Sequence, residues 1–497
     1  MFKPNPLFTN SSILCHGREI ALFGEADDGM RITAELTDAN GSTLGKVACT
    51  AHAERFLMYL PAQKPQTGCT LKMTCGDETF MATDVAIGEL WLAGGQSNME
   101  LPLMNADGGK EEIAVHNDPL LRFFDVPKWA RACNEADEAF TNTRWQKALP
   151  GEAAWVSAVA YWFAKKARAH RDMPVGIVDC WWGGTSVTCW LPEEALRATA
   201  AGQRYLDEYA EKSAGITMED YLKAEDDFYR ELNAWNVRVA RVREIRRQDT
   251  PWAEIEAQAG VCPWNPPVGP GSPYRPCGLY EHMLRQVMPA SLNGFLYYQG
   301  EEDATRTDRY DLLMAQLITQ WRQDFGGENL PFLFVQLPGW SNEGDHFAWP
   351  RLRLQQAAVR DAIRNTGLAV TIDLGEKEDI HPTVRQPVGE RLFEVARSVA
   401  WGEAGEDSPE ATGIQHIPGA LLVQLNCQVV SSGVPRGFEI CGADGVWYPA
   451  DAEIANEVII LTAKEVPEPL HARYAFLDWP EVNVFGENGL PLAPFWM

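Results

Sequence analysis

The apolar run from Gly88 to Gly95 (GELWLAGG) constrains the fold of this chain more than any other segment. A continuous apolar run that ends in glycines is typical of a parallel strand that is buried on both faces and enters a tight turn. Similar runs recur at 174–181, 294–298 and 332–337. Apolar residues at helical spacing occupy stretches between these runs, at 153–171, 280–288 and 308–325. This alternation predicts an α/β fold with a doubly wound parallel sheet.

The segments on either side of this domain show a different pattern, in which short alternating runs are separated by turn signals. Residues 1–86 are therefore predicted to form an N-terminal β-sandwich-like domain, and residues 405–497 a C-terminal β-rich, sandwich-like domain. The α/β domain spans residues 87–404. A stretch rich in Glu, Arg and Ala at about 192–262 has helical periodicity and is predicted to be a helical insertion in it.

Composition excludes several classes of partner. The formal net charge of −26 would repel nucleic acid backbones and anionic membrane surfaces. The first residues lack a basic segment followed by an apolar one, and no stretch approaches the roughly 20 apolar residues of a membrane helix, so a cytoplasmic location is expected. The 11 cysteines are scattered without a C-x-x-C pair, so neither a disulfide framework nor a zinc site is indicated. The oligomeric state is left open, a homo-oligomer included.

A serine follows the first buried strand directly, in Gly94-Gly95-Gln96-Ser97-Asn98-Met99-Glu100. Ligands of open parallel sheets bind at the carboxyl ends of the strands, so the position suits a nucleophile. The G-x-S-x-G elbow of α/β-hydrolases is absent, because Met99 stands where its second glycine would be. A serine in a glycine turn is also a common helix N-cap, and this segment alone does not separate the two interpretations.

A base for Ser97 is offered by Asp379-Ile380-His381, which follows the strand-like run 368–373. A carboxylate so near an imidazole can hold its tautomer and stabilise the imidazolium that acyl transfer creates. Of the nine histidines, His381 alone combines a neighbouring acid with the end of a strand. Glu301, in the acidic Gln299–Asp303 segment after another strand, is a second candidate to orient His381, unless that segment is simply a solvated loop.

The turn Trp181-Trp182-Gly183-Gly184-Thr185 follows a third buried strand. Glycine turns of this kind can offer free backbone N–H groups to a developing oxyanion. The alternative is an ordinary connection from a strand to a helix.

Together these segments resemble the sialate O-acetylesterase family, a family of SGNH-type hydrolases related to acetyl xylan esterases. The resemblance covers nearly the whole chain and rests on four blocks in the same order: Gly88–Trp91 with Gly95–Glu100, Trp182–Thr185, Tyr298–Glu301 and Asp379–Pro382. It implies an SGNH-hydrolase-like α/β domain flanked by the two β-rich units.

The resemblance also implies a role for each matched residue. Ser97 would be the nucleophile and His381 the base, with Glu301 or Asp379 as the acid, and the amides of Ser97 and Gly184 would bind the oxyanion. The family commonly has Ser-Asn or Ser-Asp after this glutamate, whereas this chain has Glu302-Asp303, which puts a third oxyanion donor in question. Gln299 and Gln96 are the candidates to replace that donor. The residues expected to contact the substrate are Gln96, Asn98 and Trp182.

The implied function is hydrolysis of acetyl esters on sugar hydroxyls through an acetyl-enzyme, with an acetylated sugar or oligosaccharide as the partner and no metal or organic cofactor. One alternative is an acetyl xylan or acetylmannan oligosaccharide esterase, because the motifs describe acetyl transfer to water rather than a particular sugar. The other is a non-catalytic carbohydrate-binding protein on the esterase scaffold. A complete Ser/His/acid set favours an enzyme.

Overall fold

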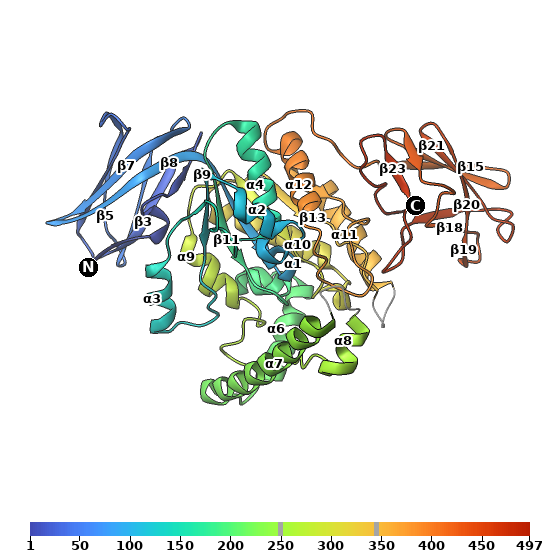
Figure 1. Ribbon diagram of the computed structural model, residues 1–497, viewed down its shortest axis with the longest axis horizontal. Helices are drawn as coiled ribbons and strands as arrows, with labels where there is room; N and C mark the ends of the chain where they lie inside the picture. Colours follow the sequence, from blue (N-terminus) through green and yellow to red (C-terminus); the bar gives the residue numbers. More distant parts are fainter. Residues whose placement is uncertain (247–251, 342–346) are drawn as a thin grey trace.

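A computed structural model describes residues 1–246, 252–341 and 347–497 of the chain. A mixed α/β body lies at the centre of the molecule, between a β-rich N-terminal region and a β-rich C-terminal region at opposite ends of its longest axis (Figure 1). The predicted combination of a central sheet containing parallel strands with additional antiparallel sheets is confirmed.

The body is built on a sheet with the strand order β10-β9-β11-β8-β12-β13-β14. Neighbours from β9 to β14 run parallel, and β10 joins the edge antiparallel. The strands are β8 (Glu78–Gly95), β9 (Asp118–Asp125), β10 (Gln146–Ala148), β11 (Val175–Trp181), β12 (Gly294–Tyr298), β13 (Phe332–Val335) and β14 (Thr366–Ala369). After β8 the chain first forms β9, β10 and β11, which lie on one side of β8 in the sheet. It then forms β12, β13 and β14 on the other side of β8, so the strand order switches beside β8. Open α/β sheets bind their ligands at such a switch point.

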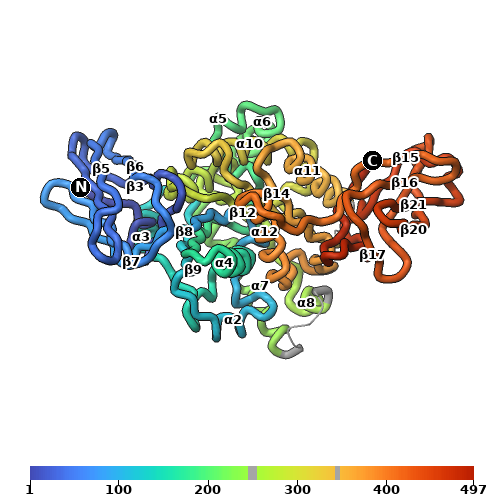
Figure 2. The backbone as a smooth tube through the Cα atoms, turned by 90° about the horizontal axis from the view of Figure 1, so that it is seen from above, coloured from blue at the N-terminus to red at the C-terminus, as the bar shows by residue number. Residues whose placement is uncertain are grey.

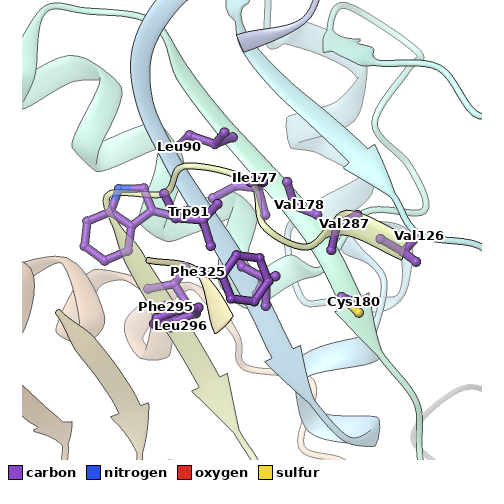
Figure 3. Packing of buried hydrophobic residues seen from close by; sticks show 14 of the residues in the cluster. Leu90, Trp91, Val126, Ile177, Val178, Cys180, Val287, Phe295, Leu296 and Phe325 are labelled. Atoms are coloured by element: carbon purple, nitrogen blue, oxygen red, sulfur yellow. The ribbon is translucent and has the colours of Figure 1, made fainter. Parts of the chain in front are cut away.

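Helices cover both faces of this sheet, α10 and α11 on one side and α4 and α12 on the other (Figure 2). On the α4 face, Trp91 packs edge-to-face against Phe163 with ring centroids 5.1 Å apart. On the α10 face, a Cβ at Gly94 would lie 2.7 Å from the Trp321 ring, so only glycine allows the helix this close. Figure 3 shows the apolar residues that β8, β11 and β12 contribute to the core. The helices are α4 (Ala158–Arg171), α10 (Tyr310–Asp324), α11 (Ala348–Ala362) and α12 (Gln386–Val399).

Shorter helices connect these elements. They are α1 (Ser97–Glu100), α2 (Gly109–Val115), α3 (Asn134–Asn142), η1 (Pro6–Phe8), η2 (Leu103–Asn105), η3 (Val187–Trp190) and η5 (Ala304–Arg306). The helix predicted over 280–288 is a π-type turn, η4 (Tyr280–Leu284), followed by α9 (Arg285–Val287).

The N-terminal region contains two sheets that share a core with the body. One consists of β1 (Phe2–Pro4), β3 (Ile20–Ala26) and β6 (Arg55–Leu60); the other contains β2 (Ile13–Cys15), β4 (Arg31–Thr37), β5 (Thr43–Thr50), β7 (Gln66–Cys75) and the first part of β8. The domain boundary predicted between residues 86 and 87 falls inside β8. In this strand Ala86 pairs with Ile13 of β2, and Glu89 pairs with Val175 of β11.

The C-terminal region consists of antiparallel sheets around a core of its own. Its strands are β15 (Ala411–Ile417), β16 (Ala420–Leu425), β17 (Val429–Ser431), β18 (Phe438–Cys441), β19 (Trp447–Pro449), β20 (Asp451–Ala455), β21 (Val458–Thr462), β22 (His471–Tyr474), β23 (Val484–Gly486) and β24 (Phe495–Trp496). The run predicted as a strand over 368–373 leaves the body sheet after Ala369, because Val370 and Ile372 are buried in this second core. Arg353 of α11 adds a polar link, donating to the carbonyl oxygens of Ala475 and Leu477 at 3.0 and 2.9 Å.

The predicted insertion forms helices α5 (Glu193–Arg197), α6 (Ala200–Ser213), α7 (Met218–Arg246) and α8 (Trp252–Ala259). Helices α7 and α8 pack together through a small apolar core that includes Val239 and Ile255, and they project from the body at the bottom of Figure 1. Among the described helices, none is long and apolar enough to cross a membrane.

Candidate active site

Ser97 begins α1 immediately beyond the carboxyl end of β8. The turn before it requires glycine, because Gly95 has a φ of +131° and a Cβ there would lie 2.1 Å from the Tyr298 carbonyl oxygen of β12. The Gln96 amide donates to the same oxygen at 3.0 Å. The Gln96 side-chain oxygen in turn accepts from the amides of Gly300 and Glu302 at 3.4 and 3.3 Å. Gln96, predicted to contact substrate or oxyanion, thus joins the serine turn to the loop after β12.

The glycine turn after β11 lies directly against the serine. A Cβ at Gly183 would be 3.2 Å from the Ser97 Cβ, and the Gly183 amide donates to the Glu100 carboxylate at 2.7 Å. Gly184 has a φ of +73°, a left-handed conformation that favours glycine. The amides of Ser97 and Gly184 donate no hydrogen bond to any part of the chain that the structure describes. The serine turn and the glycine turn that packs on it therefore each carry one N–H group without a partner in the described residues.

The side-chain amide of Gln299, by contrast, has hydrogen-bond partners within the protein. Its side-chain nitrogen donates to the Thr185 carbonyl oxygen at 3.2 Å and to the Asp303 carboxylate at 2.5 Å. Both N–H bonds of the amide are thus engaged within the protein, so the geometry lends no support to the predicted oxyanion role. Gln299 instead fixes the loop that carries Glu301.

His381 lies in the loop between β14 and α12, with 45% of its side chain exposed. The Asp379 carboxylate accepts a hydrogen bond from the His381 amide at 2.8 Å and lies 3.9 Å from the ring nitrogen Nδ1. Partial burial lowers the pKa of His381, and the Asp379 charge opposes this effect. A lowered pKa favours the neutral imidazole, which is the form that can accept a proton.

Asn98 connects the serine helix to the histidine loop. The buried side chain donates from its amide nitrogen to the Ile380 carbonyl oxygen at 3.0 Å and to the Glu301 carboxylate. Its amide oxygen accepts from the buried guanidinium of Arg385. Asn98 thus holds Ile380, which precedes the histidine, and Arg385, which follows it, while its predicted contact with the substrate stays a prediction. Arg385 lies outside the sequence motifs, so it could not be identified from the sequence.

The two candidate acids occupy different places in this arrangement. Asp379 faces His381, whereas Glu301 is buried against Asn98. The second carboxylate oxygen of Glu301 has no hydrogen-bond partner within residues 1–246, 252–341 and 347–497. Burial raises the pKa of Glu301, and hydrogen bonding to Asn98 lowers it. In the same described ranges, no group of three or more His, Cys, Asp or Glu side chains is placed to hold a metal ion.

Comparison with known proteins identifies the family. The model of the family described as carbohydrate esterase, sialic acid-specific acetylesterase, matches residues 87–216 and 264–397, which is more than half of the chain. The chain belongs to this carbohydrate esterase family. The family predicted from four sequence blocks is thereby confirmed, and the chain is an enzyme of the carbohydrate esterase class.

The carbohydrate esterase is similar to named relatives along most of its length. It is 25% identical to the sialate O-acetylesterase of Mus musculus and 26% identical to that of Rattus norvegicus, covering 95% of this chain and 90% of each relative. A crystal structure of a carbohydrate acetylesterase from Xanthomonas citri is 27% identical, with a TM-score of 0.77 over 100% of this chain and 99% of the other.

Aromatic side chains surround the glycine turn of this carbohydrate esterase. Trp182, predicted to contact substrate, is half-buried, and the Lys128 amine lies 5.7 Å from the centroid of its ring. Lys128 also contacts the Glu100 carboxylate. Beyond Gly184 lie Trp264 and Tyr274, from the Pro- and Gly-rich loop that follows α8. Sequence reasoning missed Trp264, because an irregular loop has no periodicity that would place one of its side chains at a site.

Proposed function

We propose that this carbohydrate esterase removes acetyl groups from sugar hydroxyls, with Ser97 as nucleophile and His381 as general base. The observation that carries the proposal is the contact between Asn98 and Ile380, because Asn98 follows the serine and Ile380 precedes the histidine. These residues lie 282 positions apart in the chain, yet one side-chain hydrogen bond joins their loops. The placement beside the switch point of the sheet agrees with an SGNH-type fold.

In the first step, the Ser97 oxygen bonds to the acetyl carbonyl carbon while His381 takes the hydroxyl proton. The amides of Ser97 and Gly184 donate to the resulting oxyanion. The sugar oxygen then leaves with the proton from His381, as an alcohol. Water attacks the acetyl group on Ser97 and gives a proton to His381, which returns it to Ser97 as acetate leaves. Each oxyanion donor is worth roughly 10²-fold or more in rate.

We assign the orienting acid to Asp379, because its carboxylate is the one that contacts His381. The distance of 3.9 Å to Nδ1 exceeds that of a hydrogen bond, and such contacts often tighten when substrate binds. Glu301 then acts through Asn98, as a buried partner that sets the position of the histidine loop.

The acyl-enzyme provides a direct test. Wild-type protein quenched during turnover of p-nitrophenyl acetate should carry one acetyl group on Ser97, detected by peptide mass spectrometry, and Ser97→Ala should abolish turnover. Ser431→Ala, in β17 of the C-terminal region, is the matched control and should keep wild-type activity. Retained turnover in Ser97→Ala, or an acetyl group found only on another residue, would refute the assignment.

A further inference from the structure

An exposed tryptophan continues the active-site surface beyond the oxyanion glycine. Gly183 packs on Ser97, and a Cβ on the next residue, Gly184, would lie 2.8 Å from the indole of Trp264 and 3.2 Å from Tyr274. The contacts thus run without interruption from the nucleophile to the indole. Trp264 is nevertheless 49% exposed. A large apolar ring is therefore left open to solvent next to the glycine turn that packs on Ser97.

The indole of Trp264 is supported by other aromatic rings. Phe228 of α7, which is 9% exposed, makes an edge contact with it at a centroid distance of 5.9 Å. Tyr274 makes a second edge contact, at a centroid distance of 5.8 Å. Neither contact is a parallel stack. These rings position the indole, which keeps much of its surface available for another flat apolar group.

The charges in this region favour an uncharged ligand. Lys128 contacts Glu100, and Arg131 pairs with Glu225 of α7 at 3.0 Å. The positive charges of Lys128 and Arg131 are thus already compensated by carboxylates. Asp379 adds another acidic group near the catalytic histidine. Lys128 and Arg131 therefore offer no uncompensated positive charge to attract a ligand carrying a free carboxylate.

We propose that Trp264 is the stacking platform for a neutral acetylated sugar, whose ring lies on the indole while its acetyl group reaches Ser97. The inference rests on the proposed function and narrows its substrate class to sugars without a carboxylate. The family model does not match residues 217–263, which contain α7 and its Phe228. Phe228, which supports the indole, thus lies between the two ranges that the family model matches, and Trp264 is the first residue of the second range.

Binding to the Ser97→Ala protein tests this inference separately from catalysis. Isothermal titration would measure the Kd of an acetylated xylo-oligosaccharide, as the neutral probe, and of O-acetylated sialic acid, as the anionic one. The neutral probe should bind more tightly. Adding Trp264→Ala should weaken its binding about tenfold or more, and Trp264→Phe should restore part of the loss. Tyr59→Ala removes an aromatic residue of similar exposure (48%) from β6 and should change nothing.

Three results would refute the proposed role of Trp264. They are equal Kd values for the neutral probe with and without the Trp264 indole, no measurable binding of the neutral probe, or tighter binding of the O-acetylated sialic acid than of the neutral probe. Circular dichroism and thermal unfolding of each variant would show that the fold is kept. If Ser97→Ala still hydrolyses p-nitrophenyl acetate, the proposed function fails instead. If that variant is inactive and its sugar binding is insensitive to Trp264, only the platform fails.

Discussion

Replacing Asn98 by alanine should damage stability and catalysis together. The substitution removes one hydrogen bond to the Ile380 carbonyl oxygen and two to buried charged groups, Glu301 and Arg385. A neutral hydrogen bond is worth about 1 kcal/mol, and one to a charged group about 1.5–3 kcal/mol. Allowing for water that enters the space, we expect a loss of about 4 kcal/mol in the free energy of unfolding.

The catalytic loss has a different cause. Without Asn98, the loop that carries His381 loses its link to the helix that carries Ser97. A displacement of about 1 Å in a catalytic group can lower the rate about 10²-fold. We therefore expect kcat for p-nitrophenyl acetate to fall by about that factor, with a smaller change in KM.

Urea unfolding and steady-state kinetics of Asn98→Ala, Glu301→Ala and the double variant would measure both effects. If Glu301 acts through Asn98, the double variant should be more stable than the sum of the single losses predicts, with a coupling of about 1–3 kcal/mol. A stability loss below about 1 kcal/mol together with an unchanged kcat would refute the reasoning. Strictly additive stability losses would show that Asn98 and Glu301 do not act together.

Three further predictions concern pH and the glycine turn. The acid limb of kcat/KM should lie below the ordinary histidine pKa of about 6.5, because burial lowers the pKa of His381; Asp379→Asn should move it lower still and reduce kcat, and an upward shift would contradict this. Burial raises the pKa of Asp179 to about 7, so the folded state holds a proton that the unfolded chain releases near pH 4, and stability falls as pH rises between these values. Asp179→Asn should therefore shrink the difference in unfolding free energy between pH 5 and pH 8 by up to about 3 kcal/mol, and an unchanged difference from urea unfolding would count against it. Gly184→Ala should lower kcat about tenfold or more, because its Cβ would press on Trp264 and shift the oxyanion amide; wild-type turnover of p-nitrophenyl acetate would exclude that amide.

The strand ends of the body could be located from the sequence alone. The apolar runs before Ser97, Gly184 and Glu301 are each long enough to be a buried strand, and parallel strands place their carboxyl ends at one edge of the sheet. The three loops are therefore expected to meet, whatever the details of the helices between them.

Which partner each side chain takes was not predictable, because those contacts join distant segments. Asn98 sits beside the serine in sequence, where it was predicted to contact the substrate, and nothing local indicates that its amide reaches Ile380. The choice between Asp379 and Glu301 depends on the path of the loop after β14. That loop leaves the sheet after Ala369 because Val370 packs in the C-terminal core. A strand predicted from the spacing of apolar residues cannot include such a tertiary contact.

The length of β8 bears on how this enzyme can be divided or recombined. The single strand from Glu78 to Gly95 pairs with β7 in the N-terminal region and with β11 and β12 in the body. It also leads directly into the turn before Ser97. A cut between residues 86 and 87 would sever its hydrogen-bonded ladder in mid-strand. Exchanging the N-terminal region at that point would therefore break a strand that also belongs to the sheet of the catalytic body.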